Sequence, residues 1–246
     1  AYKKAASVNW CDTCGTVLAN EQVEDGRCWR CHNPVSKKNL KQWFIKITDY
    51  AQELLDDIEK DLQGWPKRVR IMQTNWLGRS EGADLTFRVP ELDCGIEVYT
   101  TRFDTVFGVT FIALAPEHEL VQRMMEHMPQ DEAEAMREFV QKAAAQSSIE
   151  RSDASAEKLG FKTPFSGINP VTGKPAPIWL ANYILTDYGT GAIMGVPAGD
   201  QRDFGFCRKY GIPVVPVVQP KDGTLLDGDT MTEAFTEYGI VANSGH

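Results

Sequence analysis

Two pairs of cysteines near the N-terminus constrain this chain more than any other feature. Each pair has the pattern Cys-x2-Cys, and thirteen residues separate the two pairs. A tight turn directs both sulfurs of a pair the same way, so two such turns complete a tetrahedral zinc site. Because protein side chains fill all four positions, the predicted ion is structural rather than catalytic. The candidate ligands are Cys11, Cys14, Cys28 and Cys31.

Two other interpretations of these cysteines are open at this stage: a pair of disulfides, or an emptied site with vestigial cysteines. The first residues, AYKKAASVNW, lack the apolar stretch of a secretory signal, and this favours a metal site over disulfides. A module this small also cannot order itself on hydrophobic burial alone. His32 adjoins Cys31 and could replace one ligand.

Length and charge limit the function classes. The chain has 246 residues with 42% apolar content, enough for one large domain or two smaller ones. It has no apolar run of about 18 residues, so we expect no membrane span and no membrane partner. The expected location is the cytoplasm. The net charge of −8 disfavours coating of a long duplex but leaves room for a pocket that takes a strand end. The missing initiator Met favours a piece of a longer protein.

The pattern divides the chain into three parts. Residues 1–38 form a loop-rich zinc-binding module, and residues 39–79 form a linker. Within the linker, apolar residues recur at three- and four-residue steps from Trp43 to Leu62, which predicts an amphipathic helix of about six turns. A short basic segment and a hinge bracketed by glycines follow. Residues 80–246 form the third and largest part.

The third part is predicted to be rich in β-strands. ADLTFRV and IEVYTT alternate as a β-hairpin, and VFGVTFIALAP contains a buried strand. Residues 117–160 have helical periodicity with a break at Pro129, strands return from residue 165, and MTEAFTEYG predicts a short terminal helix. Strands and helices come in separate runs, which indicates an α+β fold and not a doubly wound parallel sheet.

The stretch GTGAIMGVPAGDQRDFGF raises a choice between a phosphate-binding loop and a strand with a turn. A dinucleotide fingerprint needs its glycine loop to open a helix, and Pro197 blocks a helix at that point. We therefore expect a helix that begins later, with Asp200 as its N-cap and Asp203 three positions on, as in a capping box. A dinucleotide-binding enzyme is the weaker alternative.

The segment VYTTRFDTVFG places hydroxyl and charged side chains at the end of a predicted strand. Such a turn can donate several hydrogen bonds to a sugar or a carbonyl oxygen. The signal is weak by itself, because threonine is common in strands. The polar residues of this strip are Thr100, Thr101, Arg102, Asp104 and Thr105.

Several long motifs, in order, resemble the CP1 editing insertion of bacterial leucyl-tRNA synthetase with its adjoining zinc module. The matching segments are VLANEQVEDGRCWRC, QWFIKIT, WLGRSEG, TTRFDTVFG, YGTGAIMGVPAGDQRDFGF and KYGIPV. The resemblance implies a β-rich, barrel-like editing domain with peripheral helices, beside a zinc-knuckle module and a linking helix. The HIGH-type and KMSKS-type motifs of the synthetic site are not in the chain, so ATP would serve only the full-length synthetase.

The implied activity is hydrolysis of the ester of mischarged tRNA-Leu, with noncognate aliphatic amino acids accepted and leucine excluded. The implied partners are the aminoacylated terminal adenosine at the tRNA 3′ end and the rest of the synthetase. The chemical need is clear, because a synthetic pocket gains only about 1–3 kcal/mol from one methylene. A second pocket supplies the remaining fidelity.

The resemblance also implies residue roles. The threonine-rich strip holds the terminal adenosine and the acyl group, and Thr105 is the steric gate against leucine. Asp203 pairs with the α-ammonium of the substrate. The expected catalytic residues are thus Asp203, Thr105 and Thr101. Thr100, Arg102 and Asp104 would bind substrate with Met194, Val196, Asp200 and Arg202, the last two by supporting the turn.

Two positions depart from the family pattern. Phe103 stands where the family usually has Pro, and Gly199 stands where it usually has His. Phe103 loosens a fixed turn, and Gly199 removes an imidazole and adds backbone freedom. These changes support an alternative function, in which the chain is a zinc-bearing tRNA-end-binding module with an impaired hydrolytic site.

Overall fold

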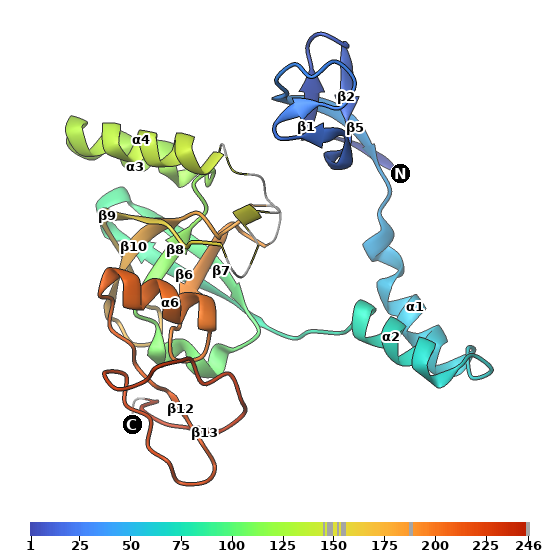
Figure 1. The fold of residues 1–246 in the computed structure, drawn as a ribbon. Helices are drawn as coiled ribbons and strands as arrows, with labels where there is room; N and C mark the ends of the chain where they lie inside the picture. Colours follow the sequence, from blue (N-terminus) through green and yellow to red (C-terminus); the bar gives the residue numbers. More distant parts are fainter. Residues whose placement is uncertain (145, 147–149, 152, 154–155, 187–188, 245–246) are drawn as a thin grey trace. The chain divides into compact units, whose positions relative to one another are not determined.

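The computed structural model describes residues 1–144, 146, 150–151, 153, 156–186 and 189–244. It divides into two compact units, Ala1–Arg79 and Ser80–His246, here called the N-terminal unit and the C-terminal unit (Figure 1). None of the described helices is long and apolar enough to cross a membrane.

The N-terminal unit is built on a three-stranded antiparallel sheet in the order β2-β1-β5. β1 pairs with β5 along nearly its whole length, from Tyr2 opposite Phe44 to Trp10 opposite Ser36. The cysteine turns lie in the short elements that connect these strands. The elements are β1 (Tyr2–Cys11), β2 (Thr16–Leu18), η1 (Asn20–Gln22), β3 (Val23–Glu24), β4 (Arg27–Cys28) and β5 (Ser36–Phe44).

The long helix predicted from Trp43 to Leu62 is wrong in its first part. Trp43 belongs to β5 and lies opposite Lys3, whose ammonium sits 4.6 Å from the centre of the indole ring. Strand pairing with β1 therefore overrides the helical spacing of the apolar residues. Helix begins only afterwards, and the basic segment forms a second helix that the sequence did not indicate. The elements are η2 (Ile47–Tyr50), α1 (Ala51–Lys60) and α2 (Lys67–Leu77).

The C-terminal unit contains a six-stranded sheet in the order β11-β8-β10-β9-β6-β7. β8 and β10 run parallel, and the other neighbouring strands run antiparallel. The predicted hairpin is confirmed as β6 and β7, which are joined by η3. The elements are β6 (Ala83–Val89), η3 (Pro90–Leu92), β7 (Cys94–Thr100), η4 (Phe103–Gly108), β8 (Phe111–Leu114), β9 (Gly160–Ile168), β10 (Pro175–Ala181) and β11 (Ala192–Gly195).

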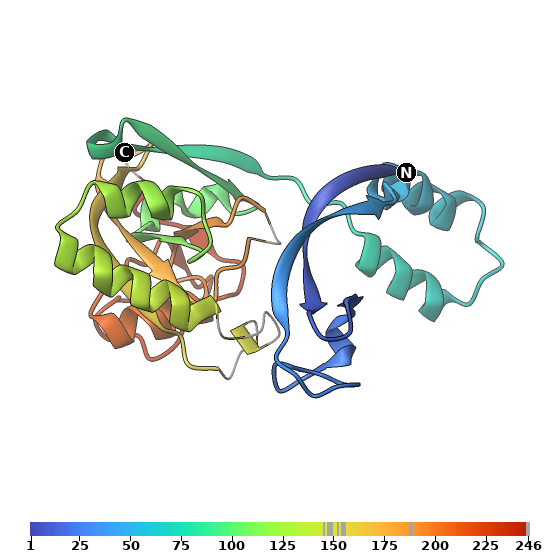
Figure 2. The same ribbon diagram turned by 90° about the horizontal axis from the view of Figure 1, so that it is seen from above.

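The edge strands β7 and β11 contact each other, so the sheet is curved. The yellow-green helices α3 (Leu120–Glu126) and α4 (Gln130–Ala144) lie side by side against it (Figure 2). Alternate residues of β8 face two different apolar clusters, as the two-residue period of a strand requires. Ile112 and Leu114 belong to a cluster with Met124 and Met136 of the α3–α4 pair. Phe111 belongs to the other cluster, which contains the buried face of α6 (Gln201–Tyr210). The predicted α+β fold is confirmed.

Three helices whose residues are all described cover this sheet. α3 (Leu120–Glu126) and α4 (Gln130–Ala144) confirm the helical pattern with its break at Pro129. α6 (Gln201–Tyr210) confirms the helix predicted after the glycine-rich stretch. Part of the predicted helical region, at 145, 147–149, 152 and 154–155, lies outside the described residues.

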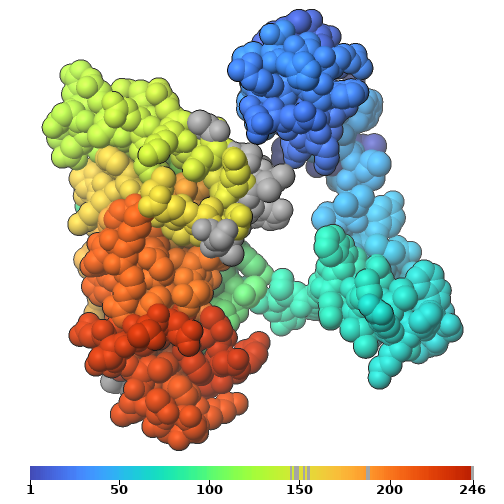
Figure 3. All heavy atoms as spheres, viewed as in Figure 1, coloured from blue at the N-terminus to red at the C-terminus, as the bar shows by residue number. Residues whose placement is uncertain are grey.

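The short terminal helix predicted over residues 231–239 is absent, since these described residues are not helical. The backbone N–H groups of Ala234 and Phe235 donate to the side chain of Gln201 and to the carbonyl of Ala198. These bonds replace the local bonds that a helix would need. The segment from residue 231 onward instead packs beside α6 (Figure 3). Its last strand, β13 (Ile240–Val241), pairs with β12 (Val218–Gln219) in a two-stranded antiparallel sheet.

Candidate functional site

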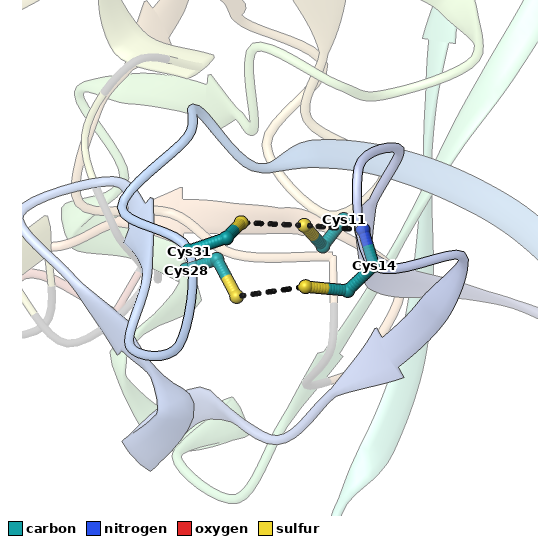
Figure 4. A group of neighbouring side chains, drawn as sticks. All are labelled: Cys11, Cys14, Cys28 and Cys31. Atoms are coloured by element: carbon teal, nitrogen blue, oxygen red, sulfur yellow. Dashed lines mark hydrogen bonds between the residues drawn. The ribbon is translucent and has the colours of Figure 1, made fainter.

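The four predicted metal ligands gather at one point of the N-terminal unit (Figure 4). Their sulfurs all lie within 4.8 Å of one another, with Cys11 Sγ 3.4 Å from Cys31 Sγ and Cys14 Sγ 4.0 Å from Cys28 Sγ. Ligands about 2.3 Å from a tetrahedral zinc would be separated by roughly 3.8 Å. These separations are far longer than a disulfide bond of about 2.05 Å. The arrangement fits a metal site and not the two-disulfide alternative.

Two tight turns produce this cluster. Gly15 takes a positive φ of 61° and donates its N–H to the Cys11 carbonyl, while the Cys14 N–H donates to Cys11 Sγ at 3.3 Å. The second turn places His32 at a φ of 57°, with its N–H bonded to the Cys28 carbonyl. His32 is exposed and does not belong to the ligand group.

The four thiols differ in charge. The backbone hydrogen bond from Asn33 lowers the pKa of Cys31 to about 6, whereas the hydrogen bonds with Cys31 and Cys11 raise the pKa of Cys14 to about 12. Cys31 is therefore ready to bind as a thiolate, and a metal would displace the proton of Cys14. A structural ion that binds these four sulfurs would supply folding free energy to a unit with few buried apolar side chains.

A second candidate site is a cavity of about 640 Å³ in the C-terminal unit. Its walls come from the end of β7, the η4 turn, the segment after β10, β11 and the first turn of α6. The predicted site residues converge here, although they lie far apart in the sequence. The predicted residues that line the cavity are Thr100, Thr101, Arg102, Thr105, Met194, Val196, Asp200, Arg202 and Asp203.

The threonine strip is held by its own hydrogen bonds. Thr100 Oγ1 accepts the Arg102 N–H at 3.0 Å, and the Thr105 hydroxyl donates to the Arg102 carbonyl at 2.8 Å. Thr105 is only 5% exposed, so its position in the cavity wall is set by packing. Asp104 is the predicted residue that does not line the cavity; it forms an ion pair with Arg102 at 2.9 Å.

Asp203 is a buried carboxylate at the cavity wall, and it is 4% exposed. The Tyr183 hydroxyl donates to Oδ1 at 3.0 Å, and the Val196 N–H donates to Oδ2 at 3.2 Å. Burial raises the pKa of Asp203 to about 7, and the charge of Asp200 adds to the effect. A carboxylate has about four acceptor positions, and these two hydrogen bonds use two of them.

Asp200 acts as the predicted N-cap of α6. Its Oδ1 accepts the N–H groups of Arg202 at 2.8 Å and Asp203 at 3.2 Å, and its Oδ2 pairs with the Arg202 guanidinium at 3.2 Å. A capping box also requires the Asp203 side chain to accept the backbone N–H of Asp200, and this half of the prediction is wrong. The Asp203 carboxylate bonds to Tyr183 and Val196, which frees it from the helix end and places it at the cavity.

The dinucleotide-binding alternative does not agree with the local structure. Gly189 and Gly191 have φ values of 67° and 72°, and they precede the strand β11. A phosphate-binding glycine loop follows a strand and opens a helix, which is the reverse order. Here the helix begins only at Gln201, after the turn that contains Pro197.

Sequence reasoning missed four residues of the cavity wall that carry polar groups: Tyr99, Tyr183, Arg151 and Lys158. Arg151 is 6% exposed, pairs with Glu117 and donates to backbone carbonyls beside Tyr183. A tyrosine in the largely apolar IWLANYIL segment was an available signal, because a buried Tyr hydroxyl usually has a partner. No local pattern connected Arg151 or Lys158 to the site.

The two departures from the family pattern fall in different places. Gly199 lines the cavity, and a Cβ there would meet only the Val196 carbonyl oxygen, at 3.9 Å. Its φ is not in the positive range, so the backbone would accept a side chain. Phe103 opens η4, is 47% exposed and does not line the cavity. Gly199 is therefore the departure that changes the cavity directly.

Known families match most of the chain. Residues 74–246 match the family model described as "Leucyl-tRNA synthetase, editing domain". Residues 1–143 match the model described as "tRNA synthetases class I (M)".

Individual proteins agree with these matches. The chain is 53% identical over 247 residues to the leucine–tRNA ligase of Symbiobacterium thermophilum and 54% identical over 245 residues to that of Thermotoga maritima. Each match covers 100% of this chain and 29% of the relative, so the chain spans less than a third of their length. Among solved structures, agnB2 LeuRS of Agrobacterium radiobacter K84, in a ternary complex with tRNA and LeuAMS, is similar with a TM-score of 0.65 and 41% identity. That match covers 92% of this chain and 27% of the other. The chain belongs to the leucyl-tRNA synthetase editing domain family.

Proposed function

We propose that the C-terminal unit is an aminoacyl-tRNA ester hydrolase that removes noncognate aliphatic amino acids from mischarged tRNA-Leu. The observation that carries the proposal is a buried carboxylate, Asp203, on the wall of a cavity that a threonine strip also lines. An aminoacyl ester bears an ammonium group beside its reactive carbonyl. The cavity offers the buried Asp203 carboxylate for that cation and hydroxyl groups for the ester and the ribose. The other carboxylate that lines it, Asp200, is occupied by the α6 N-cap and by the Arg202 guanidinium.

Binding of the ammonium follows from the electrostatics of Asp203. Burial costs its carboxylate much of its solvation, so in the empty cavity the pKa lies near 7. A cation at hydrogen-bond distance favours the ionised form and lowers the pKa again. The ion pair would fix the α-carbon and present the ester carbonyl to the threonine strip.

The reaction is ester hydrolysis. Water attacks the carbonyl carbon, the oxyanion forms, and the ester C–O bond breaks with the proton going to the ribose oxygen. The products are the free amino acid and tRNA with its terminal hydroxyl restored. Thr101 and nearby backbone N–H groups would stabilise the oxyanion. We assign no general base among the described side chains, and the free hydroxyl of the terminal ribose would orient the water.

Selectivity would come from the shape of the cavity. Met194 and Val196 supply an apolar wall for the side chain of a wrong amino acid. Thr105 would act as the steric gate, because it is buried and its hydroxyl is bonded to the Arg102 carbonyl. Thr100 and Arg102 would hold the terminal adenosine. Asp104, which does not line the cavity, would act through its ion pair with Arg102, and Asp200 and Arg202 support the turn that carries Asp203.

The proposed setting is the cytoplasm, with the 3′ end of tRNA-Leu and the rest of the synthetase as partners. The solved neighbour is a LeuRS bound to tRNA, which supports tRNA as a partner. We propose zinc at the four cysteines as a structural ion, on the basis of the sulfur geometry. ATP would serve only the synthetic reaction of the full-length enzyme.

The direct test is deacylation of norvalyl-tRNA-Leu or isoleucyl-tRNA-Leu by the chain and by Asp203→Ala. We expect the variant to lose about 100-fold or more of the rate, because it removes the only group proposed to bind the ammonium. Asp131→Asn, at the exposed start of α4, is the matched control and should keep the parent rate. An unchanged rate in Asp203→Ala would reject the role.

A second candidate function is an RNA-end-binding module with an impaired hydrolytic site. Gly199 favours it, since the cavity lacks a side chain at a position that could hold one. The same deacylation assay, combined with a measured affinity for mischarged tRNA-Leu, separates the two functions. Binding without turnover supports the module, whereas turnover supports the hydrolase.

A further inference from the structure

We propose that Tyr183 is a positioning residue, whose hydroxyl keeps Asp203 ionised and oriented toward the cavity. The proposal rests on the proposed function and deepens it, because an ammonium group binds a carboxylate only in its charged form. Nothing in the threonine strip or the α6 cap requires a tyrosine at this position. The role follows from where the structure places the hydroxyl.

The geometry leaves the carboxylate little freedom. Tyr183 Oη lies 3.0 Å from Asp203 Oδ1, and the Val196 N–H lies 3.2 Å from Oδ2. One donor on each oxygen fixes the plane of the carboxylate. Both side chains are nearly buried, at 6% and 4% exposed, and both line the cavity. The hydrogen bond is thus shielded from water, where a charge-assisted bond is strong.

Tyr183 is itself held from two directions. Its ring packs edge-on against Phe206, with 5.6 Å between ring centroids. The Arg151 guanidinium donates to the carbonyls of Asn182 and Ile184, the residues on either side of Tyr183. The hydroxyl therefore cannot turn away from Asp203 without breaking these contacts.

The surroundings of Asp203 shift its pKa in opposite directions. Burial and the charge of Asp200 raise its pKa, while the Tyr183 hydroxyl, the Val196 N–H and the charge of Arg202 lower it. Burial also raises the pKa of Tyr183 well above its usual range, so the hydroxyl stays protonated and remains a donor. Within the part of the chain that the structure describes, the other titratable groups around Asp203 are Cys207, on the same helix, and Arg151 and Lys158, which line the cavity.

The test is the pH dependence of the deacylation rate in the variant Tyr183→Phe, which lacks the hydroxyl and keeps the ring. We expect the apparent pKa of deacylation to rise by about one pH unit. At pH 6 the variant should be about tenfold slower than the parent, and above pH 8.5 the two rates should converge to within about twofold. The same shift should appear when the side-chain carboxyl carbon of Asp203 is titrated by NMR, which requires no activity.

Tyr210→Phe is the matched control. It removes the same atom from a ring that also packs on Phe206, but its hydroxyl accepts the Gly160 N–H and does not contact Asp203. In this control, the apparent pKa of deacylation and the pKa of the Asp203 carboxyl from NMR should both equal those of the parent.

Coinciding titrations of Tyr183→Phe and the parent would overturn the inference, as would a rate loss that is equal at every pH. A carboxyl shift in a chain that cleaves no mischarged tRNA would keep the positioning role of Tyr183 and reject the proposed function.

Discussion

The cysteine cluster and the cavity are built in opposite ways. The cluster uses two turns within residues 11–31, and the spacing of the residues almost determines its geometry. The cavity combines residues 98–105 with residues 183–185 and 192–203, and with Arg151 and Lys158; the first two groups meet because the curved sheet brings β7 and β11 together. The first site can form with little surrounding structure, whereas the second requires a complete fold.

The two units also differ in what stabilises them. In the N-terminal unit the buried apolar side chains are those of Cys11, Leu18, Cys28 and Ile58, and two of these four are proposed metal ligands. The C-terminal unit buries a large core, with Phe87, Ile112 and Ile178 fully inaccessible. A metal is therefore expected to stabilise one unit, and apolar burial the other.

Metal removal tests this difference with the largest expected effect. A structural zinc contributes on the order of 10–16 kcal/mol of binding free energy. Chelation, or Cys28→Ser, should release one zinc per chain and collapse the NMR amide signals of residues 1–44, while those of the C-terminal unit persist. Cys94→Ser, which changes a cysteine outside the cluster, should keep the metal and the spectrum. An ordered N-terminal unit after chelation would show that its stability does not depend on a metal.

The pH dependence of stability tests the cost of the cavity carboxylate. Because the pKa of Asp203 is raised from 3.8 to about 7, the folded state binds more protons than the unfolded state between these values. The contribution of Asp203 to the free energy of unfolding therefore falls as pH rises from about 4 to 7. Asp203→Asn removes this titration, so the variant should gain stability over the parent, by up to about 4 kcal/mol at pH 8.

Urea unfolding of both proteins at pH 5 and pH 8 measures this difference. The Asn side chain suits the site, since its carbonyl can accept the Val196 N–H and its amide can donate to Tyr183. A stability difference that is the same at both pH values would contradict a carboxylate that is costly to ionise.

Substitution of the proposed gate, Thr105, has a smaller expected effect. Two variants separate the roles of its methyl and hydroxyl groups. Thr105→Ser removes only the methyl, and leucyl-tRNA-Leu should then be cleaved about tenfold faster. Thr105→Val keeps the volume and removes the hydroxyl, so leucine should still be excluded. The Arg102 carbonyl keeps a donor in this variant, because it also accepts the Thr105 N–H. Equal survival of leucyl-tRNA-Leu with all three proteins would reject the gate.

The sequence alone predicted the elements that depend on local chemistry. The cysteine spacing indicated the metal cluster, the alternation of ADLTFRV and IEVYTT indicated the β6–β7 hairpin, and Asp200 marked the start of α6. In each case the decisive interaction joins residues that are near in sequence. The resemblance added the cavity residues, which the structure brings together apart from Asp104.

The predictions that were wrong or missing concern contacts between segments that are distant in the sequence. Trp43 had helical spacing but pairs with β1, about forty positions earlier in the chain. The residues of the predicted terminal helix bond instead to Gln201 and Ala198. Tyr183 reaches Asp203 only through the packing of α6 on the segment after β10. Such contacts leave no periodic signal in one sequence.

The most direct test of the proposed site is a crystal structure of the chain with a non-hydrolysable analogue of charged adenosine that carries norvaline. We predict that the ammonium nitrogen lies within about 3.2 Å of the Asp203 carboxylate, with the norvaline side chain against Met194 and Val196. An ammonium group bound away from Asp203, or an analogue that binds outside this cavity, would contradict the proposed function.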